Sequence, residues 1–145
     1  MPRTLKMSSG FYLYGDDLNP LEITDLLGIE PTGAHLKGEV VVGKTTGRAY
    51  SPRKTGLWSH VISLDGEAVE EVVAGALGYF DRVDRDLSSL PNVTRANFDV
   101  FATALCGPED DRQLEFEFTP LQLGRLAYLG VVATISLGTI PTEDD

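Results

Sequence analysis

A helical stripe of apolar residues between positions 67 and 87 constrains the fold more than any other feature of this sequence. Its members recur at spacings of three and four, which places them on one side of an α-helix: Val69, Val72, Val73, Ala76, Leu77, Phe80, Val83 and Leu87. Charged side chains occupy the opposite side, namely Glu70, Glu71, Asp81, Arg82 and Arg85. A helix with one apolar side must pack against a second layer, so the chain needs a partner layer with an apolar surface.

Two shorter helices are predicted from a start signal that occurs twice. In the first copy Asn19 is the cap, Pro20 takes the first helical position and Glu22 is the capping-box partner. Leu18 and Ile23 form a hydrophobic staple, Ile23, Leu26 and Leu27 share the apolar side, and Gly28 ends the helix. Residues 118–123 repeat this signal in the same order, and the second helix ends before Gly130. Both copies follow an aromatic segment, which predicts an internal strand–helix repeat.

Six strands are predicted around the three helices from alternation and β-branched content, over residues 11–14, 34–42, 57–64, 95–106, 114–118 and 131–137. The expected order is strand, helix, strand, strand, helix, strand, strand, helix, strand. We therefore expect an α+β fold, a ferredoxin-like sandwich with an added strand–helix–strand unit and a mixed, mostly antiparallel sheet covered by helices. A doubly wound parallel sheet is disfavoured, because residues 114–118 are expected to form an antiparallel hairpin with residues 95–106.

Length and composition limit the number of domains. A chain of 145 residues corresponds to one domain. We expect one α+β domain over residues 1–145, with a short mobile N-terminus at 1–8 and a mobile acidic tail at 142–145. One Cys excludes an intrachain disulfide, and the lack of a long apolar run argues against a membrane span or a signal peptide. A cytoplasmic location is therefore expected.

The charge balance bears on possible partners. Twelve basic and 22 acidic residues give a formal charge of −10, which argues against nucleic-acid binding, because that depends on neutralising phosphates with Lys and Arg. A field of this sign attracts a basic protein instead.

Residues 38–45 match the literal phosphate-binding-loop pattern G-x-x-x-x-G-K-[ST]. The chemistry of such a loop needs successive backbone amides between a buried strand and the start of a helix. Three consecutive valines favour an extended strand, and Gly47, Pro52 and Gly56 interrupt any helix after Lys44. We therefore reject a nucleotide site here.

The surrounding loop is a candidate anion-binding segment. No acidic residue lies between Val40 and Leu64, whereas four cations cluster near the middle of this stretch. The candidate ligand-binding residues are these cations and one nearby aromatic residue: Lys44, Arg48, Arg53, Lys54 and Trp58. They suit a phosphate or another small anion through charge-assisted hydrogen bonds. The competing interpretation is a solvated loop with Trp58 in the core.

Residues for catalysis are scarce. His35 and His60 are the two imidazoles, and no His, Cys or carboxylate cluster has the spacing of a metal site. A Cys106 nucleophile with His60 as its base is one alternative, although Cys106 ends an apolar alternating segment and suits a buried position. We expect no cofactor, no metal and no enzymatic activity.

The order of several motifs resembles a known family. Residues 11–20 (FYLYGDDLNP), residues 23–31 (ITDLLGIEP), residues 37–39 (KGE) and Trp58 resemble domain-of-unknown-function family 4279, and residues 123–137 are similar to its closing helix and strand. The resemblance covers most of the chain and supports the fold. It implies no activity, cofactor or catalytic residue.

Three functions follow as hypotheses. The first is a non-enzymatic protein-binding module, bacterial and cytoplasmic, that binds a basic partner as an immunity protein binds a cationic toxin. The second is a small anionic-ligand or phosphate-binding domain that uses the basic loop 44–54. The third is a hydrolase that uses Cys106 or His60. An exposed sheet face is also a candidate homodimer contact, through Tyr12, Tyr14, Phe101 or Trp58.

Overall fold

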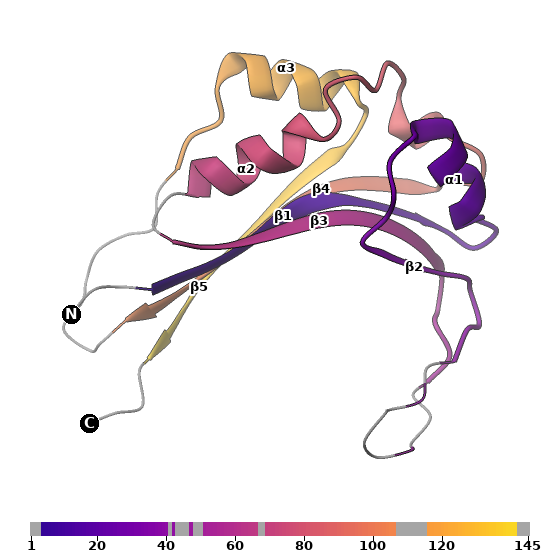
Figure 1. Cartoon of the computed structure of the whole chain (residues 1–145), viewed down its shortest axis with the longest axis horizontal. Coiled ribbons are helices and arrows are strands. Elements are labelled where there is room, and N and C mark those ends of the chain that lie inside the picture. The colour runs from indigo at the N-terminus through magenta and orange to yellow at the C-terminus, as the bar shows by residue number, and fades with distance from the viewer. Residues whose placement is uncertain are drawn as a thin grey trace.

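Five strands form one sheet, and the three α-helices lie on the same side of it (Figure 1). The computed structural model describes residues 4–40, 42, 47, 51–66, 69–106 and 116–141. In chain order the elements are β1 (Thr4–Gly15), α1 (Pro20–Leu27), β2 (Gly33–His35), β3 (Gly56–Gly66), α2 (Val69–Gly78), the 3-10 helix η1 (Leu87–Ser89), β4 (Arg95–Cys106), α3 (Pro120–Tyr128) and β5 (Val132–Pro141). The expected α+β fold with a mixed, mostly antiparallel sheet is confirmed.

The longest strands lie at the centre of the sheet, whose order is β2-β3-β1-β4-β5. The central strand β1 is antiparallel to both β3 and β4, whereas β4 and β5 are parallel. Both edges of β4 are therefore occupied, and the predicted hairpin between residues 95–106 and 114–118 is wrong. Residues 116–118, the described part of that second segment, are not in a strand. Their alternation has another cause, since Phe116 and Phe118 pack against the core.

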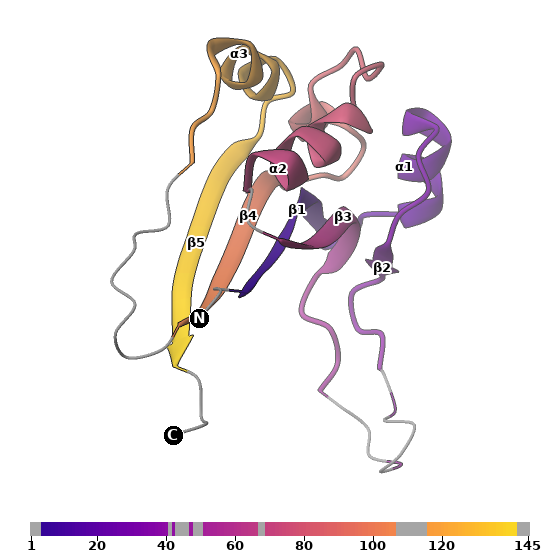
Figure 2. The ribbon, with the colours of Figure 1, turned by 60° about the vertical axis from the view of Figure 1, so that its left-hand side comes forward.

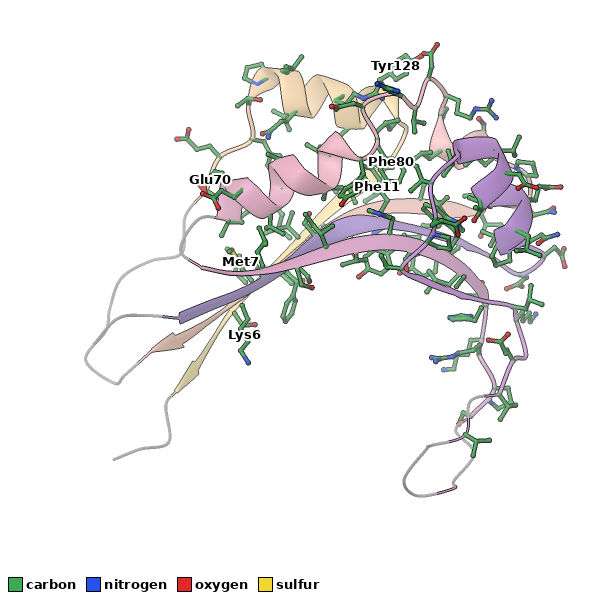
Figure 3. The ribbon with its side chains drawn as sticks, viewed as in Figure 1. Lys6, Met7, Phe11, Glu70, Phe80 and Tyr128 are labelled. Atoms are coloured by element: carbon green, nitrogen blue, oxygen red, sulfur yellow. The ribbon has the colours of Figure 1, made fainter. Side chains whose placement is uncertain are left out.

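Successive side chains of each strand point to opposite faces of the sheet. In β1, Met7 points toward the helices and Lys6 points away from them (Figure 3). The helix-facing side carries a cluster of aromatic rings with no exposed surface, Phe11, Trp58, Phe80 and Phe98. The centroids of Phe11 and Phe80 lie 4.0 Å apart, and those of Phe11 and Phe98 lie 4.9 Å apart. This cluster joins β1, β3 and β4 to the segment that follows α2.

The helix α2 ends at Gly78, earlier than the apolar stripe predicts. The chain continues through turns and then through η1, where the Asp86 side chain accepts from the backbone N–H of Ser88 at 2.8 Å. Nevertheless every stripe residue beyond α2, namely Phe80, Val83 and Leu87, is buried. The apolar stripe therefore predicted burial correctly as far as Leu87, although the α-helix ends at Gly78, nine residues earlier.

The two predicted helix starts are confirmed. Asn19 caps α1 by accepting from the N–H of Leu21 at 3.1 Å, one residue earlier than the predicted box with Glu22 requires. Gly28 ends α1 in the left-handed conformation, with φ 70. Leu26, expected in the core, is exposed instead. In α3 a complete capping box forms between Thr119 and Gln122.

Two predicted boundaries are wrong. The strand expected over residues 34–42 has three residues, Gly33–His35, because the chain turns away from the sheet and Gly38 adopts φ 84. The central strand starts at Thr4, so residues 4–8, expected to be mobile, lie in the sheet. Met7 is buried, which explains why this end of the strand is held. Residues 1–3 and 142–145 lie outside the described residues.

The two faces of β4 allow a matched test of this arrangement. Phe98→Ala removes a fully buried ring, and we expect the free energy of unfolding to fall by about 3–5 kcal/mol. Phe101→Ala removes a half-exposed ring from the opposite face of the same strand, and we expect a loss below about 1 kcal/mol. Urea unfolding of both variants measures the difference, and equal losses would contradict the assigned faces.

Candidate functional site

The described arms of the basic loop, residues 36–40 after β2 and residues 51–55 before β3, extend away from the helices (Figure 1). Lys44 and Arg48 lie outside the described residues, whereas Arg53 and Lys54 are described and exposed. Backbone hydrogen bonds join the two arms of the loop, since Gly38 donates to the Arg53 carbonyl at 2.8 Å and Arg53 donates to the Glu39 carbonyl at 2.9 Å. The phosphate-binding-loop pattern begins in this arm at Gly38, and residues 51–55 lead into β3 rather than into a helix.

Trp58 does not belong to a ligand site, and this prediction is wrong. Its side chain has no exposed surface and packs edge-on against Phe80, with the ring centroids 6.2 Å apart. Its indole Nε1 donates to the Thr24 hydroxyl at 3.0 Å, which ties β3 to α1. The ring therefore faces the helices, and a ligand held by Arg53 and Lys54 has no access to it.

The pairing of strands separates Cys106 from His60. His60 lies opposite Phe11 in β1, and Phe11 lies opposite Phe98 in β4. Cys106 follows Phe98 by eight residues in the same strand, a separation of roughly 26 Å along the strand at about 3.3 Å per residue. The predicted nucleophile and base therefore do not meet, and the hydrolase that joins them is wrong.

His60 is a buried core histidine. Its ring packs on Tyr79, with centroids 4.4 Å apart, and lies edge-on to Phe80. The Nδ1 atom is buried and has no hydrogen-bond partner among the described residues. Burial disfavours the charged imidazolium and lowers the pKa of His60 below its usual 6.5.

A row of polar and aromatic side chains lies on the sheet face opposite the helices. Its members are Tyr12 and Tyr14 of β1, Arg95, Asn97 and Asp99 of β4, and Thr134 of β5, and we call this row the tyrosine face. Arg95 Nε donates to Asn97 Oδ1 at 2.7 Å, and Asn97 Nδ2 donates to Thr134 Oγ1 at 3.2 Å. Sequence reasoning did not single out Arg95 and Asp99, although the alternation over residues 95–103 was the signal that marks them.

The two tyrosine rings of this face are nearly parallel to each other. Their ring planes are 9° from parallel and their centroids lie 6.3 Å apart. Partial burial raises the pKa of Tyr12 and Tyr14, and the negative charge of Asp99 adds to the effect. Both hydroxyls therefore remain protonated donors at neutral pH. Phe101, expected at a dimer contact, also lies on this face and is half exposed.

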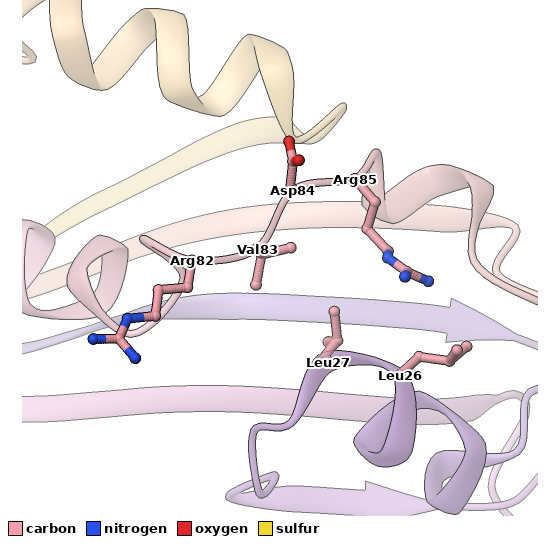
Figure 4. A pocket seen from close by; sticks show the side chains of 6 residues that line it. All are labelled: Leu26, Leu27, Arg82, Val83, Asp84 and Arg85. Carbon is pink, nitrogen blue, oxygen red and sulfur yellow. The ribbon is translucent and has the colours of Figure 1, made fainter.

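A small pocket opens between α1 and the segment that follows α2 (Figure 4). Its volume is about 190 Å³, and its lining residues are Leu26, Leu27, Arg82, Val83, Asp84 and Arg85. The guanidinium groups of Arg82 and Arg85 point away from each other (Figure 4), so they do not converge on one anion. The Asp84 carboxylate accepts a hydrogen bond from the Tyr128 hydroxyl. The pocket therefore lacks the donor arrangement of a phosphate site.

Among the described residues, negative charge is concentrated on the helical side of the sheet. We call residues 16–32, 69–94 and 116–131 the helical layer, and they contain three basic and eleven acidic residues, a formal charge of 3 − 11 = −8. Five of the acids lie in residues 16–32, which contain no Lys or Arg. On the opposite face, the described charged side chains are Lys6, Arg95 and Asp99. The two faces therefore differ strongly in charge.

Comparison with known proteins gives one match. The chain matches the domain of unknown function DUF4279 over residues 5–139, which is nearly its full length. The chain belongs to the DUF4279 family. No curated protein and no solved structure matches this DUF4279 domain. The resemblance in the strand and helix motifs is thereby confirmed.

Two further features of the DUF4279 domain bear on its chemistry. Within the described ranges, no helix combines the length and apolar character needed to cross a membrane. In that same part of the chain, no three His, Cys, Asp or Glu side chains come together as a metal site would require.

The lowered pKa of His60 predicts how stability depends on pH. The unfolded chain binds a proton at His60 near pH 6.5, whereas the folded domain binds it at lower pH, so the free energy of unfolding falls as the pH drops below about 6.5. Tyr79→Ala uncovers the ring, and we expect the pKa of His60 to rise toward 6.5 and this pH dependence to weaken. NMR titration of the imidazole measures the pKa of His60, and urea unfolding between about pH 5.5 and 7.5 measures how the free energy of unfolding depends on pH. A wild-type pKa at or above 6.5 would contradict the burial argument.

Proposed function

We propose that this DUF4279 domain is a non-enzymatic protein-binding module that binds a basic protein partner through its helical layer, as an immunity protein binds a cationic toxin. The observation that carries this proposal is the segregation of charge, with a formal charge of −8 on the helical layer. The setting we propose is the cytoplasm of a bacterium. We also propose a ferredoxin-like sandwich with an internal repeat that is limited to the two capped helices, since both α1 and α3 begin with a capped Pro. The strand expected before α3 is not formed by residues 116–118.

The end of the helical layer at α1 is the proposed centre of the interface. Residues 16–32 hold Asp16, Asp17, Glu22, Asp25 and Glu30, and all five side chains are exposed. One of them, Asp16, forms an ion pair with Lys37 at 3.3 Å. The others face solvent over a short stretch in which no basic residue offsets them. A basic surface that approaches this end is attracted over about 8 Å at physiological salt.

Apolar side chains lie among these acids. Leu21 is 77% exposed and Leu26 is 38% exposed, both on α1. Protein interfaces combine an apolar centre with a polar rim, and charges at the rim raise the rate of association more than the affinity. The two leucines therefore supply contact area, and the surrounding carboxylates orient a basic partner before contact.

Charge neutralisation at α1 tests this function. The triple variant Glu22→Gln/Asp25→Asn/Glu30→Gln removes three negative charges at the proposed centre. The matched control Glu70→Gln/Glu71→Gln/Glu117→Gln removes three charges from the remainder of the helical layer. With a partner captured from source cells and purified, we expect the α1 variant to slow association by about tenfold at low salt and the control to slow it by a smaller factor.

The identity of the captured protein and its response to salt complete the test. We expect a basic protein at one-to-one stoichiometry whose association slows as NaCl is raised from about 50 to 300 mM. An acidic partner, or an association rate equal in both triple variants, would overturn the proposal. Thermal melts of both variants confirm that they remain folded.

A further inference from the structure

The strand β5 leaves a long, uncharged edge on the sheet. It is the last strand in the order, and among the described residues its one neighbour is β4. All seven side chains described in it, residues 132–138, are exposed and uncharged, and its one Pro, Pro141, is its last residue. They include the large apolar residues Val132, Ile135 and Leu137. Soluble proteins usually protect an edge with charges, Pro or a short strand, because unpaired backbone groups bind other strands.

The opposite edge of the same sheet is protected. The strand β2 has three residues, and the chain leaves the sheet immediately after His35. Residues 16–32, with five acids and no basic residue, lie next to this edge through α1, which contacts β3. The β2 edge is short and lies next to acidic residues, whereas the β5 edge is long and uncharged. The β5 edge is therefore the one at which another strand can pair.

Charge restricts where two copies of this chain can meet. Two molecules that each carry −10 repel each other at most orientations. Figure 2 shows α3 above β5, with α1 at the far side of the sheet near β2. Residues 116–141 contain one acid, Glu117, and one cation, Arg125, so this described stretch of α3 and β5 is neutral. The Arg125 guanidinium is itself engaged by the carbonyl oxygens of Phe80 and Val83. On the charges of the described residues, two copies therefore approach with least repulsion at their β5 edges.

We propose that β5 pairs with β5 of a second copy, antiparallel about a two-fold axis that passes through Ile135. Antiparallel pairing places directly opposite residues on the same sheet face. With Ile135 on the axis, Ala133 lies opposite Leu137 of the second copy on the helical side, and Thr134 lies opposite Ser136 on the other side. Apolar residues thus meet apolar residues and hydroxyls meet hydroxyls, as an isologous interface requires.

The occupant is a second copy rather than a basic protein, because the edge offers no carboxylate to attract one. The two-fold axis stands perpendicular to the sheet, so both helical layers lie on the same side of a continuous sheet of ten strands. The inference does not depend on the proposed function, since α1 is far from the axis in both copies (Figure 2). An interface limited to one pair of edges is small, so the dimer is expected to dissociate in the micromolar range.

Sedimentation over a concentration series tests the association. We expect the wild-type mass to rise from 15.7 kDa toward twice that value between about 5 and 200 µM. Ile135→Lys places two ammonium groups face to face on the axis, and we expect it to weaken association at least tenfold. Leu121→Lys adds the same charge at a position 83% exposed on α3, and we expect it to dimerise like wild type. A wild-type chain that stays monomeric at the highest concentration would overturn the proposal, and a partner strand from another protein would then be the alternative.

Cross-linking tests the register independently of the lysine variant. In a Cys106→Ser background, Ile135→Cys places two thiols opposite each other at a Cα separation of about 4.5–5.5 Å, which suits a disulfide. We expect mild oxidation to give a covalent dimer at least tenfold faster than with Leu121→Cys in the same background. Equal rates, or a dimer that persists in Ile135→Lys, would contradict pairing through β5. Far-UV circular dichroism verifies that each variant is folded.

Discussion

The stacking of Phe11 on Phe80 determines how the rest of this domain is arranged. Phe11 lies in the central strand, and Phe80 lies just beyond α2, with their ring centroids 4.0 Å apart. Once this ring faces the helices, the two-residue period of the strand assigns every other residue of β1 to a face. Strand pairing then extends the assignment to β3 and β4, so Trp58 and Phe98 join the buried cluster. The same constraint places Tyr12, Tyr14 and Asp99 on the opposite face.

Because all three helices cover one face of the sheet, the acidic side chains can lie on the outer side of the helices while the apolar side chains form the core. The charged residues Glu70 and Glu71, on the side of α2 opposite the apolar stripe, are exposed, and the acids around α1 lie at one end of the helical layer. The neutral side of the layer lies above β5. Charge therefore varies across the molecule from the β2 edge to the β5 edge. The basic partner and the second copy of the chain that we propose would therefore bind at different ends of the domain.

The parts of the fold that depend on local chemistry were predictable, and the parts that depend on tertiary contacts were not. Asn19 signals a helix through its capping side chain, and Pro20 and Gly28 do so through their backbone geometry; the structure confirms all three. The stripe through Leu87 predicted burial, but apolar spacing does not distinguish a helix from turns whose side chains reach the same core. Residues 116–118 alternate like a strand because Phe116 and Phe118 pack on the core. They cannot pair with β4, because β1 and β5 occupy both of its edges.

The candidate site shows the same limit. Of the five predicted ligand residues, Trp58 is in the core, Arg53 and Lys54 are exposed, and Lys44 and Arg48 lie outside the described residues. A tryptophan next to a basic loop has the composition of a binding site, and only its strand parity decides that it faces the helices. The difference in charge between the two faces could not be predicted from the sequence alone. The acids at residues 16–32 and 69–94 are far apart in sequence, and only the arrangement of the helices brings them to the same side of the sheet.

Amide hydrogen exchange of the domain alone and with its captured basic partner locates the surface that the partner covers. We expect protection to increase within residues 16–32 at the α1 end of the helical layer and to stay unchanged along Arg95–Cys106. Protection that instead appears across β4 and the tyrosine face, with residues 16–32 unaffected, would contradict it.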